Sequence, residues 1–192
     1  HVTVVLENLF QPHNASAVMR SCDCFGVQDI HVIENGNQYK LNEEIALGSS
    51  QWIDTHKYNQ FENNTLDCIN QLKSKGYKII ATTPHTDDVT IDQLELNEPT
   101  ALFFGTELTG ISDIAMEHAD GFVKIPMQGF TESFNISVSA ALCMYDVTTR
   151  LRQSDIPWQL SETAKIEIEI DWCKQVIKHA DKVEKEILAR RK

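Results

Sequence analysis

Five polar residues stand where the strands and helices expected for this chain begin or end: Asn14, Arg20, Glu107, Ser133 and Asn135. The set offers one guanidinium, one carboxylate, two amides and one hydroxyl. Such groups suit a neutral or cationic small molecule held beside a substrate that carries phosphates, because a guanidinium pairs well with phosphate. The same residue types also have structural uses. An asparagine or a serine can cap a helix, and Arg20 can pair with Asp23 on a solvated helix face.

Two short apolar strands must position most of these residues. Residues 101–104 form a continuous apolar run that stops at a glycine, and residues 122–125 form a second run that stops at a proline. Each run leads into a polar loop and then a helix, which Ser112 caps in the first case and Asn135 opens in the second. Open α/β sheets bind ligands at the carboxyl ends of their strands, so two neighbouring tips predict a binding crevice.

The rest of the chain alternates strand and helix. Apolar or β-branched runs bounded by turn residues predict four more strands, at 2–6, 29–33, 52–58 and 77–83. Apolar residues at helical spacing predict helices between them, at 14–25, 43–47 and 61–75. We expect Asn14 to cap the first helix and Gly26 to end it in a left-handed turn. Strands joined by helical crossovers predict an α/β fold with a mainly parallel sheet of about six strands flanked by helices.

Residues 161–188 are predicted to form one long, separate helix. Six residues make an apolar stripe along it: Ile166, Ile170, Cys173, Ile177, Ala180 and Ile187. A narrow stripe can pack on the protein's own core or join two subunits, and the sequence leaves both readings open. We therefore assign residues 1–152 to one domain and residues 153–192 to a C-terminal helical extension.

The charge balance argues against a broad nucleic-acid surface. The formal net charge is −11, whereas phosphate binders usually present a basic field. Residues 161–192 carry eight basic and seven acidic residues, so the negative excess lies in residues 1–160. Any RNA surface must therefore be local and built from few cations. The available ones are Arg20, Lys124, Arg150, Arg152 and the terminal residues 190–192.

The sequence gives little support for a nucleotide-binding loop or a metal site. Gly105 and Gly110 have the spacing of a phosphate-binding loop, but Ile111 stands where its lysine must be, and there is no G-x-G-x-x-G. Cys22 and Cys24 are weak ligands for a metal without a histidine pair, so we expect no metal site. Five irregularly spaced cysteines predict a reduced cytoplasmic protein with buried thiols. No apolar run approaches the roughly 18 residues of a membrane span.

Three stretches together resemble the motifs of the TrmH (SpoU) family of SPOUT methyltransferases: HNASAVMRSCDCFGV at 13–27, LFFGTELTGIS at 102–112 and KIPMQGFTESFNISVSAAL at 124–142. That family transfers a methyl group from S-adenosylmethionine to a ribose 2′-hydroxyl of RNA. The start of the chain, VVLENLFQP, and the helix after Trp158 resemble the branch that modifies a guanosine in the tRNA D-loop. Two alternatives stay open: a ribosomal-RNA 2′-O-methyltransferase of the same family, and a non-catalytic RNA-binding protein on the same fold.

The resemblance implies a C-terminal trefoil knot, the SPOUT or alpha-beta knot fold. It also implies a homodimer with the active site close to the subunit interface. We expect the first and last helices of the core to form that interface, with Ala140, Ala141 and Cys143 allowing close approach and the 161–188 helix adding to it.

The resemblance also assigns residues to the site. Asn14, Arg20, Glu107, Ser133 and Asn135 match the family's catalytic positions. Five positions match its S-adenosylmethionine contacts: Thr82, Gly105, Ile125, Met127 and Phe134, where leucine is more usual at the last. Methyl transfer from a sulfonium is an in-line displacement that also requires loss of the hydroxyl proton. The family favours the first-motif arginine, here Arg20, for that proton. A guanidinium is almost always charged, so the role of base requires help from a nearby phosphate or carboxylate. Base and charge stabiliser both remain open roles for Arg20.

Overall fold

A computed structural model describes residues 1–84, 89–106 and 108–190 of the chain. The chain forms two compact units, His1–Trp158 and Gln159–Lys192. Seven strands of the first unit form one sheet in the order β3-β2-β1-β6-β4-β7-β5, and all the paired strands run parallel. The strands are β1 Val2–Glu7, β2 Asp29–Ile33, β3 Asp54–Tyr58, β4 Lys78–Thr82, β5 Val89–Thr90, β6 Thr100–Phe104 and β7 Gly121–Lys124.

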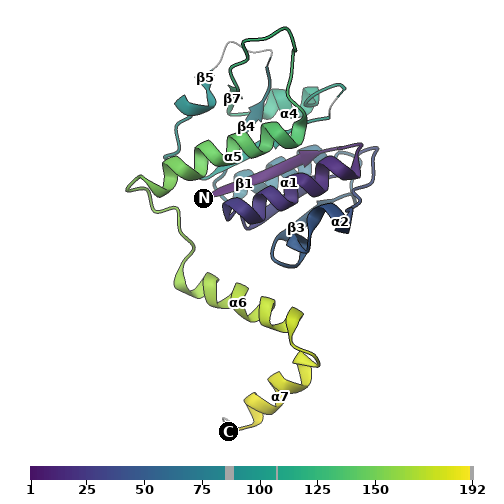
Figure 1. The fold of residues 1–192 in the computed structure, drawn as a ribbon, viewed down its shortest axis with the longest axis vertical. Coiled ribbons are helices and arrows are strands. Elements are labelled where there is room, and N and C mark those ends of the chain that lie inside the picture. Colours follow the sequence, from purple (N-terminus) through teal and green to yellow (C-terminus); the bar gives the residue numbers. More distant parts are fainter. Residues whose placement is uncertain (85–88, 107, 191–192) are drawn as a thin grey trace. The chain divides into compact units, whose positions relative to one another are not determined.

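Helices cover both faces of this sheet (Figure 1). On one face α1 (Pro12–Phe25) and α5 (Ile136–Arg152) lie side by side, and α2 (Glu43–Ala46) packs on α1. On the other face lie α3 (Asn64–Ser74) and α4 (Asp113–His118). Two short 3-10 turns complete the unit, η1 (Ser49–Gln51) and η2 (Ile91–Gln93).

The central strand β6 shows why its sequence is continuously apolar. Leu102 and Phe104 pack into the core on the α1 and α5 side, whereas Ala101 and Phe103 pack into the core on the α3 side. Side chains alternate between the two faces of a strand, so a parallel strand covered by helices on both faces must be apolar at every position.

The parallel α/β architecture expected from the sequence is confirmed, with one strand more than expected. The additional strand, β5, has only two residues, which is too short for a periodic pattern to reveal. The trefoil knot stays a prediction, because strand order alone does not define the path of the connections and residues 85–88 lie outside the described part of the chain.

The start of α1 differs from the expected one. The helix begins at Pro12 with Gln11 at the N-cap, and the Gln11 side chain makes no capping hydrogen bond. Proline is favoured in the first turn because its φ is already helical and its missing N–H would have no partner there. Asn14 therefore lies inside the first turn, and the expectation that it caps the helix is wrong. Gly26 ends α1 with φ 72, the left-handed turn predicted from the sequence.

The second unit contains two helices instead of one long helix. These are α6 (Glu162–Val176) and α7 (Ala180–Arg190), and neither has a buried residue. Ile177 adopts an extended conformation and His179 has φ 61, so the α-helical path is broken between them. Lys174 and Glu184 form an ion pair of 2.8 Å between the two helices.

All five cysteines are free, and Cys22, Cys68 and Cys143 are buried. The expectation of buried thiols is wrong for Cys24 and Cys173, which are exposed. Burial raises the pKa of the Cys143 thiol to about 12. Within the described ranges, no cluster of three or more His, Cys, Asp or Glu side chains could hold a metal ion. No described helix has the length and apolar character needed to cross a membrane.

A buried histidine on β2 makes the stability of the fold depend on pH. His31 is 3% exposed, its Nδ1 lies 3.0 Å from the Tyr58 hydroxyl, and its ring stacks on His56 with centroids 4.6 Å apart. His56 in turn pairs with Asp29 at 2.7 Å. Burial, reinforced by the nearby His56 and Lys75 and opposed by Asp29, lowers the pKa of His31 to about 4.

We expect acid to destabilise the protein through His31. The unfolded histidine takes up its proton near pH 6.5, while the folded one does so only near pH 4. The contribution of His31 is therefore complete above pH 6.5 and falls by about 3 kcal/mol as the pH drops to 4. Urea unfolding of wild type and His31→Gln between pH 6.5 and 4 measures this change in the free energy of unfolding. The pKa of Asp29 is also lowered, but its contribution is lost only below its unfolded pKa of 3.8. Equal pH slopes of stability in both proteins between pH 6.5 and 4 would therefore exclude His31 as the cause.

Candidate active site

Two of the predicted catalytic asparagines contact each other across the fold. Asn135 Nδ2 donates a hydrogen bond of 3.1 Å to Asn14 Oδ1, although 121 residues separate them. Asn135 is also the N-cap of α5, since its Oδ1 accepts from Ser137 N at 2.9 Å. Asn14 is buried in the first turn of α1. The amino ends of α1 and α5, which carry the first and third motifs, therefore meet at one point.

A cleft next to this contact brings together most of the predicted cofactor residues. Four of the five line it, and the predicted catalytic Ser133 lines it too: Thr82, Ile125, Met127, Phe134 and Ser133. The walls combine apolar side chains with hydroxyl groups. The volume of the cleft is about 50 Å³. Ligand pockets commonly measure about 300 Å³ or more, so the cleft is smaller than a typical ligand site.

The fifth predicted cofactor residue, Gly105, lies at the tip of the adjacent strand. Thr82 Oγ1 donates to Phe103 O at 2.7 Å, which ties the end of β4 to the end of β6. After β6 the chain folds back on itself, with Thr106 N donating to Gly110 O at 2.9 Å and Gly110 N to Thr106 O at 3.0 Å. A Cβ at position 105 would lie 2.1 Å from Gly110 O, so only glycine allows this turn.

Arg20 lies on α1 and its side chain is exposed. No hydrogen bond or ion pair joins it to another described residue, so the pairing with Asp23 considered from the sequence is not formed here. Glu107 lies outside the described residues, and its predicted role stays a prediction.

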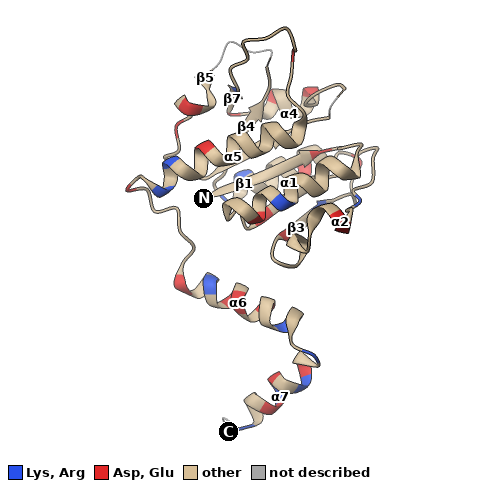
Figure 2. Ribbon diagram, viewed as in Figure 1, with Lys and Arg blue, Asp and Glu red and all other residues tan. Residues whose placement is uncertain are grey.

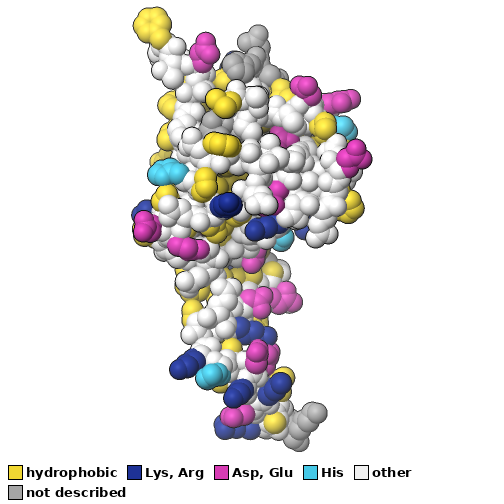
Figure 3. Space-filling model, turned by 90° about the vertical axis from the view of Figure 1, so that its right-hand side faces the viewer, with side chains coloured by type: hydrophobic (Ala, Val, Ile, Leu, Met, Phe, Trp, Pro, Cys, Tyr) yellow, Lys and Arg dark blue, Asp and Glu magenta, His cyan; other side chains and the backbone are white. Residues whose placement is uncertain are grey.

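Two cations expected to be available for RNA are used inside the protein. Arg150 donates to the carbonyls of Leu94 and Ile91, each at 2.7 Å, and pairs with Asp146 on its own helix. Arg152 donates to Phe25 O at 2.6 Å. Charged residues of both signs are scattered along the ribbon (Figure 2), and the face in Figure 3 shows few lysines or arginines on the unit that holds the sheet. An RNA surface on this unit must therefore rely on a small number of cations.

Four more residues line the cleft that were not predicted from the sequence: Thr83, Pro84, Val123 and Ser139. Two of them could have been found from the sequence. Thr83 and Pro84 directly follow the β4 tip, where a ligand crevice is expected. Ser139 lies four residues after Asn135, so it faces the same side of α5.

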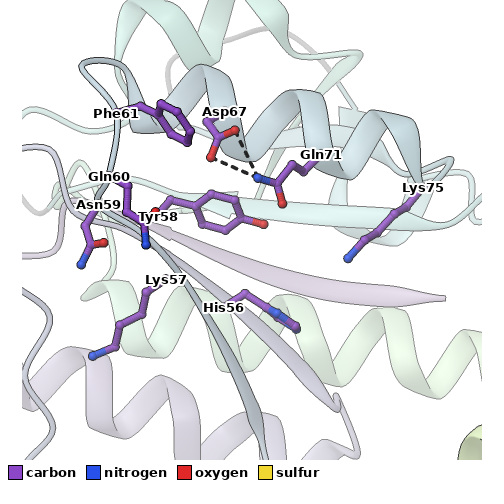
Figure 4. Close-up of a pocket in the computed structure, with 9 residues that line it drawn as sticks. All are labelled: His56, Lys57, Tyr58, Asn59, Gln60, Phe61, Asp67, Gln71 and Lys75. Carbon is purple, nitrogen blue, oxygen red and sulfur yellow. Dashed lines mark hydrogen bonds between the residues drawn. The ribbon is translucent and has the colours of Figure 1, made fainter.

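A larger, polar cavity of about 260 Å³ lies between β3 and α3 (Figure 4). His56, Tyr58 and Lys75 are among its lining residues, and Asp67 accepts a hydrogen bond from Gln71 along one wall. None of the residues that carry the three motifs lines it. Three strands also separate the edge strand β3 from β4 in the sheet, so this cavity is separate from the candidate active site.

Comparison with known proteins agrees with this geometry. Residues 1–145 match the SpoU rRNA Methylase family. The tRNA (guanosine(18)-2′-O)-methyltransferase of Borreliella burgdorferi is 44% identical over 184 residues, covering 96% of this chain and 83% of that protein. The crystal structure of the A. aeolicus TrmH/SpoU tRNA modifying enzyme superimposes with a TM-score of 0.79 at 28% identity, covering 92% of this chain and 90% of that one.

A more distant structure shares the fold. It is the SpoU methyltransferase AviRb from Streptomyces viridochromogenes in complex with AdoMet, with a TM-score of 0.69 at 20% identity, covering 79% of this chain and 61% of that one. A parallel sheet with a cleft at the carboxyl ends of its strands defines the cofactor-binding α/β class of proteins. Within that class, the chain belongs to the SpoU methylase family.

Proposed function

We propose that this protein is an S-adenosylmethionine-dependent RNA methyltransferase that acts on a ribose 2′-hydroxyl, that of a guanosine in the tRNA D-loop. The observation that carries the proposal is the Asn14–Asn135 hydrogen bond, which joins the first and third motifs beside the cleft. The relative at 44% identity is a tRNA (guanosine(18)-2′-O)-methyltransferase, which favours tRNA over ribosomal RNA. A tRNA substrate also fits the cytoplasmic location expected from the cysteines.

The cleft has the chemistry that S-adenosylmethionine requires. Apolar side chains from Ile125, Met127 and Phe134 can cover a planar base, while the Ser133 hydroxyl can bond a ribose or an amino acid group. The Thr82 hydroxyl already donates to Phe103 O, so Thr82 would contribute its backbone and methyl group. When bound, this cofactor supplies an electrophilic methyl group.

The side chains around the cleft have two further roles, which are to orient the helix ends and to act on the attacking oxygen. Asn14 and Asn135 hold each other in one orientation, which fixes the amino ends of α1 and α5 beside the cofactor. Arg20 is exposed on α1 and pairs with no other described residue, so its guanidinium can meet a phosphate or the ribose oxygen. In that position it either stabilises the oxyanion or accepts the hydroxyl proton, and the second role requires a nearby phosphate or carboxylate to take a proton from the guanidinium first. In both cases Arg20 acts on the attacking oxygen.

Label transfer from S-adenosylmethionine tests the function. The full-length chain is incubated with tritiated cofactor and two tRNA transcripts, one of them carrying a 2′-deoxy residue at guanosine 18. A chelator is present throughout, because the proposed mechanism uses no metal. We expect label in the all-ribose transcript and none in the 2′-deoxy transcript, since only the former has the accepting hydroxyl.

Other outcomes decide between the alternatives. If label appears only in ribosomal RNA, the proposed reaction is correct but the substrate is ribosomal RNA and not tRNA. Cofactor and RNA binding without any label would support the non-catalytic RNA-binding protein. A requirement for a divalent ion would overturn the metal-free mechanism.

We further propose a homodimer formed through α1 and α5. One face of α5 carries Val138, Leu142 and Tyr145, which are 44%, 39% and 60% exposed. These positions are spaced four and three residues apart, so they share one side of the helix. Ala140 and Cys143 are fully buried in the chain's own core, so the expectation that they face a second copy is wrong. The exposed stripe, beside the site, is the surface that a second copy would cover.

Leu142→Glu is expected to dissociate this dimer. A charge placed in a buried apolar contact costs about 2 kcal/mol or more, which weakens association at least about thirtyfold. Sedimentation equilibrium at micromolar concentration measures the change. Phe61→Glu is the matched control, because Phe61 is 63% exposed on the segment before α3. If the two variants have the same dimer dissociation constant, α5 is not the interface.

A further inference from the structure

The last residue of β1 is a buried acid that the proposed chemistry does not use. Glu7 is 2% exposed. Its Oε1 accepts hydrogen bonds of 2.6 Å from Thr65 Oγ1 and of 2.6 Å from Ser112 Oγ, and its Oε2 accepts one of 2.9 Å from Ser112 N. No described lysine or arginine forms an ion pair with Glu7. Buried carboxylates are costly unless such contacts compensate them.

The surrounding groups are arranged for a carboxylate. Asn35 Nδ2 donates to Thr65 Oγ1 at 2.8 Å, and Ala115 N donates to Ser112 Oγ at 3.2 Å. Both hydroxyl groups therefore accept one hydrogen bond and direct their own protons at Glu7. With the Ser112 amide, three donors point at one side chain that can only accept.

These contacts tie the loop after β6 to the sheet. Ser112 is the N-cap of α4 and ends the turn that begins at Gly105. The start of the turn is fixed because Gly105 packs directly against the Gly110 backbone. The end of the turn is fixed by Glu7 through both the amide and the hydroxyl of Ser112. The described residues of this turn, 105–106 and 108–112, are thus held at two points, and Glu7 is the side chain that holds the second.

We propose that Glu7 is a positioning residue for the reaction. Its carboxylate fixes Ser112 and with it the end of the turn after β6, and through that contact it sets where Gly105 and Gly110 lie beside the cofactor. The inference rests on the proposed function for the identity of the cofactor. The contacts of the carboxylate with Ser112 are independent of that function.

Glu7→Gln tests the proposal without changing the size of the side chain. If the amide oxygen faces the two hydroxyls, the NH₂ group meets the Ser112 N–H, and donor faces donor. If the amide is turned over, the NH₂ group meets two hydroxyl protons, and each hydroxyl must turn its proton away and give up the hydrogen bond that it donates. Either orientation loses contacts to the loop. We expect faster amide exchange at Gly110 and Ser112 in the free protein. We also expect the KM for S-adenosylmethionine to rise between about tenfold and a hundredfold with an unchanged KM for tRNA, the range expected for a misplaced site.

Asp120→Asn is the matched control for a structural effect. Asp120 accepts hydrogen bonds from Ile79 N at 2.9 Å and from Lys73 Nζ at 2.8 Å. It lies at the amino ends of β4 and β7, whereas Glu7 lies at the carboxyl end of β1. Loss of the Asp120 carboxylate should lower stability and leave the exchange at Gly110 and the KM for the cofactor unchanged. If Glu7→Gln behaves like Asp120→Asn in both measurements, Glu7 is structural only and the proposal is wrong.

Two further variants cover the case in which Glu7→Gln does not fold. Ser112→Ala and Thr65→Val each remove one hydroxyl that donates to Glu7 Oε1, but only Ser112 belongs to the loop. We expect Ser112→Ala to raise the KM for the cofactor and Thr65→Val to leave it unchanged, and equal values would overturn the proposal. A wild-type protein that binds no S-adenosylmethionine would refute the proposed function. The exchange rates of Gly110 and Ser112 would still show whether Glu7 orders the loop.

Discussion

Arg20→Ala is expected to lower the rate of methyl transfer by at least about a hundredfold, the effect of losing a proton-transfer group or a charge-stabilising donor. The fold and the cofactor affinity should be nearly unchanged. Arg20 is exposed and has no ion pair among the described residues, and a surface substitution of this kind usually costs under about 0.5 kcal/mol. Arg20→Lys should recover little activity if the planar, bidentate geometry of the guanidinium is what the site requires.

Single-turnover rates at saturating RNA and cofactor measure this effect, because they separate chemistry from binding. Lys40→Ala is the control, since Lys40 is also exposed and its loss changes the net charge by the same amount. We expect the control to react at the wild-type rate. An Arg20→Ala rate within about threefold of wild type would show that Arg20 only belongs to a solvated helix face.

Gly105→Ala is expected to weaken S-adenosylmethionine binding by about thirtyfold. The new methyl group would lie 2.1 Å from Gly110 O and 2.3 Å from Ile111 N, and both are backbone atoms that cannot rotate away. The turn after β6 must therefore open, at a cost of about 2 kcal/mol typical of overpacking. If that strain is relieved only when the loop leaves its binding position, the cost appears in the affinity for the cofactor.

Gly129→Ala is the natural comparison, because a Cβ at position 129 would meet no atom within 4 Å. Calorimetric titration of S-adenosylmethionine into both variants and the wild type measures the difference. We expect the Gly129 variant to bind like the wild type. The same affinity for the Gly105 variant would mean that the turn after β6 does not contact the cofactor.

Local sequence signals were sufficient for most elements of the fold. The β-branched run at the start of the chain became β1, and the apolar run at 101–104 became the doubly covered strand β6. Ser112 and Asn135 cap α4 and α5 as expected, because capping depends on residues within one turn. The same local reasoning failed where a stronger signal lay nearby, since Pro12 moved the start of α1 ahead of Asn14. It also failed in the C-terminal unit, where an apolar stripe continued across a break in the helix.

The sequence by itself determined the residue types of the site, but only the tertiary structure decided which of them meet. Three motifs far apart in the chain pointed to the family. Five of the ten matched positions line the cleft, because parallel strands bring their carboxyl ends, here those of β4 and β7, to one side of the sheet. The Asn14–Asn135 contact depends on the packing of α1 against α5, which no spacing along the chain specifies. The strand predicted from the sequence ends at residue 6, so the sequence places Glu7 at the start of a solvated polar loop. Glu7 is buried because Thr65 and Ser112, far away in the sequence, fold over it and supply the donors that its carboxylate requires.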